Sequence, residues 1–316
     1  DGGALSDVMS AKGVAVFEGT AQRGWTSIPV MIFCLARLMR RNSPDIVHFY
    51  LPEAYIVGSI AALVSGCRHR VMSRRSLNNY QQKRPGTRAV EKILHRLTDA
   101  LIGNSRAVTQ QLRTEGAAID KLGLIYNGVD VRALPSMAER AHARKALGLN
   151  EDSIAGITIS NLKPYKGYEF LMAAIATLPE HFKHKLVWFC VGRDDGSKEK
   201  FAASAADLGI SAIIRWEGEQ ADIMLYLDAC DLGVLPSLEE GFSNALLEKM
   251  AAGLPVIATD VGGNREALQE CGILVPAAES SELSRAILSV LEDEQRADIG
   301  LAARARVETE FTFANS

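Results

Sequence analysis

The sequence lacks a long hydrophobic run. No uninterrupted apolar stretch reaches the roughly 18 residues expected of a transmembrane helix. The chain also has neither a starting methionine nor a recognisable secretory signal. Apolar residues make up 47% of the 316 residues and charged residues 23%. This balance is typical of a soluble globular protein. We therefore expect two globular domains and no transmembrane helix.

Cysteine and the common cofactor motifs are also scarce. The five cysteines are scattered and odd in number, at Cys34, Cys67, Cys190, Cys230 and Cys271. Such a set predicts reduced thiols in a cytoplasmic protein. No cluster has metal-ligand spacing, no G-x-G-x-x-G follows a strand, and no nucleophile elbow is visible. We expect no bound metal and no cofactor.

The net charge of −3 conceals two halves of opposite sign. Residues 1–150 hold 21 Lys and Arg against 11 Asp and Glu, while residues 151–316 hold 14 against 27. The basic half fits an anionic partner, either a membrane surface or a phosphorylated acceptor, although solvated helix faces explain it equally well. Nucleic acid is not an expected partner, because the basic segment 68–96 lacks interleaved stacking aromatics.

Apolar strands alternate with amphipathic helices along the whole chain, which predicts parallel α/β sheets. In the first half we expect strands near 14–17, 45–49, 69–73, 99–103 and 122–126, with helices near 27–41, 53–65, 87–97 and 105–115. In the second half we expect strands near 154–160, 186–191, 212–216, 232–235, 256–259 and 273–275. The helices between them lie near 168–178, 197–207, 221–228, 243–252 and 281–292. Residues 127–150 are predicted to connect the halves.

The segment 236–248 carries the most information. Glu240 precedes a helix that begins near Ser243. Glu248 lies about 7.5 Å further along the axis of that helix. The first turn of such a helix has unpaired N–H groups and the positive end of the dipole, so it suits a diphosphate. A carboxylate at Glu248 can accept hydrogen bonds from a diol such as ribose.

This spacing, with residues 250–263 and Glu266 after it, resembles the signature of group 1 (family 4) retaining glycosyltransferases of the GT-B fold. The resemblance implies two doubly wound, Rossmann-like parallel-sheet domains facing a cleft. Residues 1–130 would form the acceptor-side domain and residues 131–316 the nucleotide-sugar-binding domain. It also implies that the first strand–helix unit and the final crossover helix are missing.

The resemblance assigns roles to residues of the second half. Glu240 matches the group on the donor sugar and Lys166 a cation on the leaving diphosphate, and we expect these two to be catalytic. Asn161 stands where relatives carry Arg, and Lys163 is the expected substitute for its charge. The other expected donor-binding residues are Gly192, Gly218, Gly241, Phe242, Ser243, Asn244 and Glu248.

The first half offers fewer candidates. His48 ends a strand where relatives often carry His, and Arg74 and Arg75 follow the next strand. We expect these three on the acceptor side, with a satisfied strand-end histidine as the alternative for His48.

The predicted function is transfer of a sugar from a nucleotide sugar to a glycan, lipid-linked or small-molecule acceptor, with retention and without metal. The alternatives are a nucleotide-sugar 2-epimerase, a phosphorylase of the same fold, or a catalytically idle binding fragment. The expected location is the cytoplasm, with peripheral association at the inner face of a membrane as a variant. There the basic residues between Arg68 and Arg88 would favour an anionic acceptor.

Overall fold

The computed structural model describes residues 4–17, 27–77 and 85–315. The chain divides into two compact units that are discontinuous in sequence. The first comprises residues 1–74, 80–102 and 113–122, and the second comprises residues 75–79, 103–112 and 123–316. The boundary after residue 130 stays a prediction.

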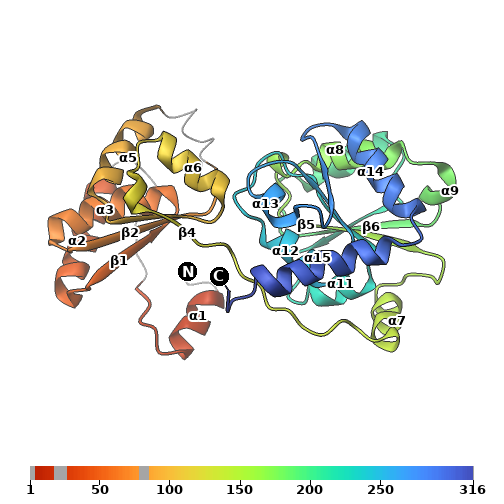
Figure 1. Ribbon diagram of the computed structural model, residues 1–316, viewed down its shortest axis with the longest axis horizontal. Helices are drawn as coiled ribbons and strands as arrows, with labels where there is room; N and C mark the ends of the chain where they lie inside the picture. Colours follow the sequence, from red (N-terminus) through yellow and green to blue (C-terminus); the bar gives the residue numbers. More distant parts are fainter. Residues whose placement is uncertain (1–3, 18–26, 78–84, 316) are drawn as a thin grey trace. The chain divides into compact units, whose positions relative to one another are not determined.

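The first sheet has four strands in the order β1-β2-β3-β4. They are β1 (Ile46–Tyr50), β2 (His69–Arg74), β3 (Ala100–Gly103) and β4 (Leu122–Leu124), and β1 and β2 are parallel. The accompanying helices are α2 (Ile28–Asn42), α3 (Pro52–Ser65), α5 (Pro85–Leu97) and α6 (Arg106–Thr114), with α1 (Ala4–Ala11) at the beginning. Figure 1 labels these elements. The strand predicted near 14–17 was wrong, because residues 14–17 form no strand and Phe17 is largely exposed.

The second sheet has six strands in the order β10-β9-β8-β5-β6-β7, and every neighbouring pair is parallel. The strands are β5 (Ile154–Ile159), β6 (Leu186–Val191), β7 (Ile214–Gly218), β8 (Leu232–Leu235), β9 (Val256–Thr259) and β10 (Ile273–Val275). The sequence predicted all six with closely similar bounds. Every residue of β8 and β9 is buried, and all of them are apolar except Thr259 at the end of β9. This is what the central strands of a parallel sheet require.

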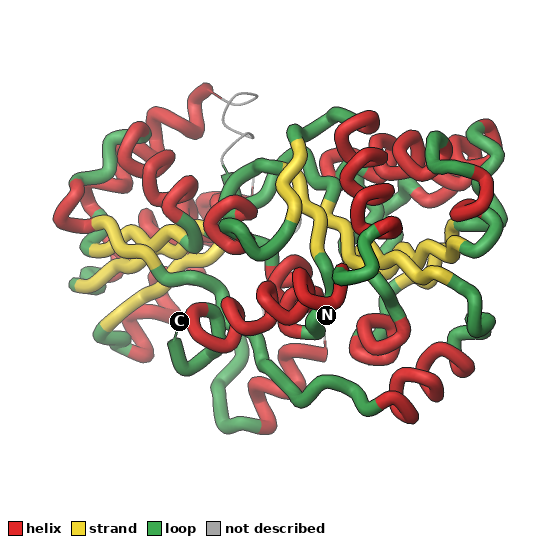
Figure 2. The backbone as a smooth tube through the Cα atoms, turned by 45° about the vertical axis from the view of Figure 1, so that its right-hand side comes forward, coloured by secondary structure: helices red, strands yellow, loops and turns green. Residues whose placement is uncertain are grey.

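Helices cover both faces of this second sheet (Figures 1 and 2). One layer contains α8 (Tyr168–Ala176), α10 (Lys198–Asp207) and α14 (Ser280–Glu292), which share one core cluster. The opposite layer contains α7 (Met137–Ala146), α11 (Met224–Ala229), α12 (Asn244–Ala251) and α15 (Arg296–Glu310). The short helices α9 (Glu180–Lys183) and α13 (Asn264–Leu268) complete this unit.

Side chains of β6 show how the two layers are separated. Trp188 and Cys190 belong to the core under α8 and α10, whereas Phe189 and Val191 belong to the core under α7 and α11. This alternation follows from the two-residue period of a strand.

The order of the strands positions the site. The chain runs outward from β5 to β7, returns to β8 beside β5, and continues outward to β10. The order therefore reverses between β5 and β8. Crevices outside the carboxyl ends of strands at such a reversal are the usual ligand sites of open α/β sheets. The loops after β5 and β8 contain residues 160–167 and 236–243, the two segments that the sequence singled out.

Candidate functional site

An ion pair joins the two loops at this reversal. Nζ of Lys166 lies 2.6 Å from Oε1 of Glu240, and both side chains are largely buried. Oγ of Ser237 donates to the same carboxylate oxygen at 2.7 Å. The sequence predicted both charged residues as catalytic but did not predict that they pair. The pair places one cation and one carboxylate at the carboxyl edge of the second sheet.

Two glycines allow the loops to approach each other this closely. A Cβ atom on Gly167 (φ +75°) would lie 1.8 Å from the carbonyl oxygen of Pro236, and one on Gly262 (φ +54°) would lie 1.9 Å from that of Glu240. The amide of Leu238 donates to the carbonyl of Tyr165, and that of Gly263 to the carbonyl of Gly241. The loop bearing Glu240 is therefore held from both sides by backbone contacts that a side chain at either glycine would block.

Helix α12 begins directly after this loop. Oγ of Ser243 accepts from the amide of Leu246 at 3.3 Å and caps the helix. Phe242 is buried against Tyr126 and Phe311, so only its backbone is available to a ligand. The helix start therefore offers backbone N–H groups and a positive dipole end beside Glu240.

Asn127 fixes the first residues of this helix. Its Nδ2 donates to Oδ1 of Asn244 at 2.7 Å and to the carbonyl of Phe242 at 2.8 Å, and its Oδ1 accepts from Arg75 at 2.6 Å. The structure thus brings Arg75, predicted on the acceptor side, into the second unit near the start of α12. Asn127 was not among the predicted site residues.

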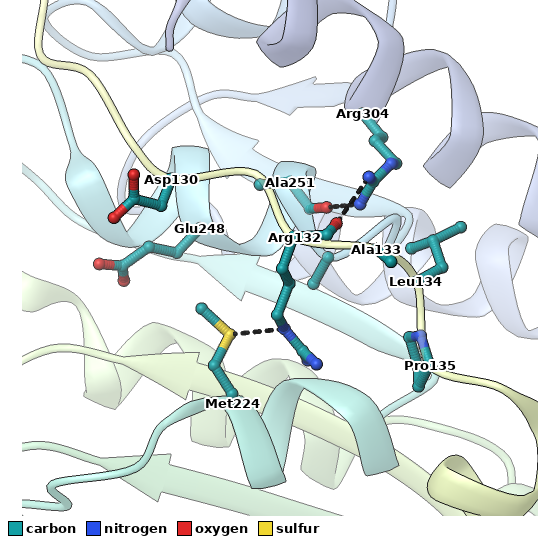
Figure 3. Close-up of a pocket in the computed structure, with 10 residues that line it drawn as sticks. Asp130, Arg132, Ala133, Leu134, Pro135, Met224, Glu248, Ala251 and Arg304 are labelled. Carbon is teal, nitrogen blue, oxygen red and sulfur yellow. Dashed lines mark hydrogen bonds between the residues drawn. The ribbon is translucent and has the colours of Figure 1, made fainter. Parts of the chain in front are cut away.

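Glu248 lines a pocket on the same helix (Figure 3). Asp130, Arg132 and Met224 also line it, and the two carboxylates of Asp130 and Glu248 lie on the same side in the view. Arg304 donates to the carbonyl oxygens of Ala251 and Arg132 and holds the wall in place. Burial raises the pKa of the Glu248 carboxyl. Two carboxyl groups on one side of a pocket can accept hydrogen bonds from neighbouring hydroxyls.

Glycines end the neighbouring strands. Gly192 (φ +151°) follows β6, its amide donates to the carbonyl of Gly218, and a Cβ atom there would lie 2.0 Å from the carbonyl oxygen of Ser160. Gly218 (φ +73°) ends β7. The structure therefore places both predicted glycines side by side at the carboxyl edge of the sheet.

Lys163, the predicted substitute for the arginine that relatives carry at position 161, forms an ion pair with another loop residue. Nζ of Lys163 lies 3.1 Å from Asp195, which also binds Arg193 at 2.9 Å. Hydrogen bonds from Arg193, and then from Lys163, lower the pKa of the Asp195 carboxyl. Asn161 is half-buried on the same loop, and its carbonyl accepts from the amide of Lys163. Lys166, rather than Lys163, is the lysine placed beside Glu240.

Arg74, which the sequence predicted on the acceptor side, lies in a buried ion-pair network. Its guanidinium is buried and binds Glu91 at 2.7 Å and Glu115 at 2.5 Å. Of the described residues, only Glu91, His95 and Glu115 come close enough together to suit a metal ion, and Arg74 binds both carboxylates. This group is built as an ion-pair network inside the first unit, and a ligand could reach Arg74 only by disrupting it.

His48 lies at the first sheet's exposed edge. Its Nε2 is 2.7 Å from Oγ of Ser73, its Nδ1 is 3.3 Å from the hydroxyl of Tyr50, and burial lowers its pKa.

Of the basic segment 68–88, Arg70 binds Asp99, and Lys83 and Arg84 lie outside the described residues. In the described part of the chain, no helix is long and apolar enough to cross a membrane.

Two family models match this chain. Residues 10–133 match "Glycosyltransferase Family 4", and residues 155–293 match "Glycosyl transferases group 1". A D-inositol 3-phosphate glycosyltransferase of Streptomyces bingchenggensis is 30% identical over 214 residues, 64% of this chain and 47% of that protein. The chain thus spans about half the length of such relatives.

Other similarities extend over nearly the whole chain. A UDP-Gal:alpha-D-GlcNAc-diphosphoundecaprenol alpha-1,3-galactosyltransferase of Escherichia coli is 26% identical over 93% of this chain and 79% of its own. The crystal structure of Anabaena HepE in complex with UDP-glucose superposes with a TM-score of 0.87 at 26% identity, covering 98% of this chain and 85% of that one. The chain has the GT-B fold, and each of its halves matches a family model of glycosyltransferases.

Proposed function

We propose that the chain transfers a sugar from a nucleotide sugar, of the UDP-sugar class, to an acceptor with retention at the anomeric carbon. The observation that carries this proposal is the Lys166–Glu240 pair beside the start of α12, at the reversal of strand order. The binding of UDP and UDP-glucose by the structurally similar HepE supports the choice of donor.

Different residues of the site would bind the diphosphate, the sugar and the ribose of such a donor. Lys166 and the N–H groups of α12 would bind the diphosphate, whose negative charge grows as the bond to the sugar breaks. Glu240 would accept hydrogen bonds from sugar hydroxyls, and Glu248 from the ribose diol. In this arrangement the bond between C1 and the phosphate oxygen breaks while C1 bonds to the acceptor oxygen on the same face. The acceptor proton passes to the departing phosphate oxygen, so no protein base is needed.

Removing each carboxylate should separate the two roles. We expect Glu248→Ala to weaken UDP binding by about 10-fold to 100-fold, since a hydrogen bond to a charged group contributes roughly 1.5–3 kcal/mol. Glu240→Ala should leave UDP binding intact or tighter, because it removes a negative charge and frees Lys166, but should abolish the added affinity of UDP-glucose over UDP. Titration calorimetry of both ligands measures this, with Glu239→Ala as the control on the same loop.

Equal losses of UDP affinity in both variants would contradict the division of roles. Donor binding with no detectable transfer to any acceptor would favour an idle binding fragment. Conversion of the donor without an acceptor would favour an epimerase, and a requirement for inorganic phosphate would favour a phosphorylase.

A further inference from the structure

Lys249 is a buried charge that no described contact explains. It follows Glu248 on α12, its side chain is 0% exposed, and its Nζ has no hydrogen-bond partner among the described residues. Burying an ammonium group without a partner costs several kcal/mol, and an apolar side chain of similar length usually stabilises such a position. Stability of the fold therefore gives no reason for a lysine here.

The path of this side chain depends on a glycine in the neighbouring strand. A Cβ atom on Gly233 of β8 would lie 2.4 Å from Cδ of Lys249 and 3.1 Å from its Cγ. Gly is unfavourable inside a strand, because it packs no side chain and has more conformational freedom to lose. Because Gly233 has no side chain, the side chain of Lys249 fits beside it. Two residues that are each unfavourable at their own position thus place an ammonium group inside the second unit.

The charges around this ammonium are those of the donor site. Helix side chains lean toward the N-terminus of their helix, so Lys249 extends toward the start of α12. The charged groups that act on it are Glu248 on its own helix, Glu240 on the loop after β8, and Lys166 on the short 3-10 helix η3 (Pro164–Lys166). Two cations and two carboxylates therefore form one cluster, in which Lys166 and Glu240 are in direct contact while Nζ of Lys249 has no partner among the described residues.

A bound diphosphate would upset this balance. It would draw Lys166 away from Glu240, leaving a largely buried carboxylate with Ser237 as its one remaining hydrogen-bond donor among the contacts of the described residues. A carboxylate in that position would repel the diphosphate as well as lose its own partner. A second cation nearby, held by packing and inaccessible to the ligand, prevents both effects.

We propose that Lys249 is a positioning residue of the donor site, whose buried ammonium neutralises Glu240 when Lys166 turns to a nucleoside diphosphate. This inference rests on the proposed function, and it assigns a residue that does not itself touch the donor. Burial lowers the pKa of Lys249 to about 8, while Glu248 and Glu240 oppose that shift. A diphosphate nearby favours the charged ammonium, so UDP binding near pH 8 should be accompanied by proton uptake.

The test compares Lys249→Met with wild type by titration calorimetry of UDP between pH 7 and 9. We expect Lys249→Met to melt at the same temperature or higher and to bind UDP about tenfold or more weakly at pH 7. Wild-type affinity should fall as the pH rises through about 8, with proton uptake that varies with the buffer's ionisation heat. Lys249→Met should lose both the pH dependence and the proton uptake. Lys145→Met, an exposed lysine on α7, is the matched control.

Each other outcome is decisive. If wild type binds UDP, and Lys249→Met binds it with the same affinity and the same pH dependence, this inference is overturned while the proposed function stands. Failure of wild type to bind UDP at any pH would overturn the proposed function and this inference with it. If Lys249→Met does not fold, proton uptake by wild type alone decides, and its absence between pH 7 and 9 would overturn the inference.

Discussion

Replacing Lys166 with alanine should reduce UDP affinity about 10-fold to 100-fold. The lost charge-assisted hydrogen bond contributes about 1.5–3 kcal/mol. Lys166 binds Glu240 at 2.6 Å, and the buried Lys249 would keep the carboxylate of Glu240 neutralised, so the loss reflects the bond to the diphosphate alone. Because the loop is held by backbone contacts of Gly167 and Gly262, the fold should persist. Titration calorimetry at pH 7 measures the loss.

Lys200→Ala provides the matched control for this variant. Lys200 pairs with Glu169 at the same distance, 2.6 Å, but both side chains are exposed and lie on α10 and α8. Exposed pairs contribute about 0–1 kcal/mol, so neither stability nor UDP affinity should change appreciably. Similar UDP affinities for Lys166→Ala and Lys200→Ala would show that the diphosphate does not bind at Lys166.

Arg74→Met should destabilise the first unit by about 3–5 kcal/mol, because removing one member of a buried ion pair leaves uncompensated charge. Glu91 is 0% exposed and Glu115 is 6% exposed, and both bind this guanidinium. His95 and Tyr55 extend the network, through contacts of 3.4 Å from His95 to Glu115 and 3.0 Å from Tyr55 to His95. Chemical denaturation at pH 7 gives the free energy of unfolding.

Arg88→Met, at an exposed position on α5, is the control for Arg74→Met. It should change stability by less than about 0.5 kcal/mol, as surface substitutions usually do. Equal, small losses in the two variants would contradict the structural role of Arg74. A loss of UDP affinity in Arg74→Met without a loss of stability would instead support the ligand-binding role that the sequence predicted for Arg74.

Strongly apolar strands made the second sheet predictable, whereas weakly apolar helices were missed. Helix α15 was not predicted, since its buried stripe consists of Gly300, Ala303 and Val307 and contains no large apolar side chain. Helix α7 was assigned to a connection, although Ser136 and Glu139 form a capping box at its start. In both, packing against the rest of the second unit, rather than a large apolar face, stabilises the helix.

The sequence also predicted only part of the candidate site. The spacing of Glu240 and Glu248 predicted the loop and helix, and the parallel topology predicted where they lie. The partners of each charge could not be predicted, since Arg74 meets Glu115 across 41 residues and Lys166 meets Glu240 across 74. The burial of Lys249 was not predicted, because a lysine beside a glutamate on a helix is ordinarily solvated. Gly233 inside an apolar strand was the one signal in the sequence that could have indicated it.

A crystal structure of the protein with UDP, grown with excess chelator, would show directly whether the diphosphate binds at Lys166 and the start of α12. We expect the diphosphate at the start of α12, with Nζ of Lys166 within about 3.2 Å of a phosphate oxygen and no longer bound to Glu240. We also expect the ribose hydroxyls to lie at Glu248. A diphosphate bound elsewhere, with the pair between Lys166 and Glu240 intact, would contradict the proposed donor site.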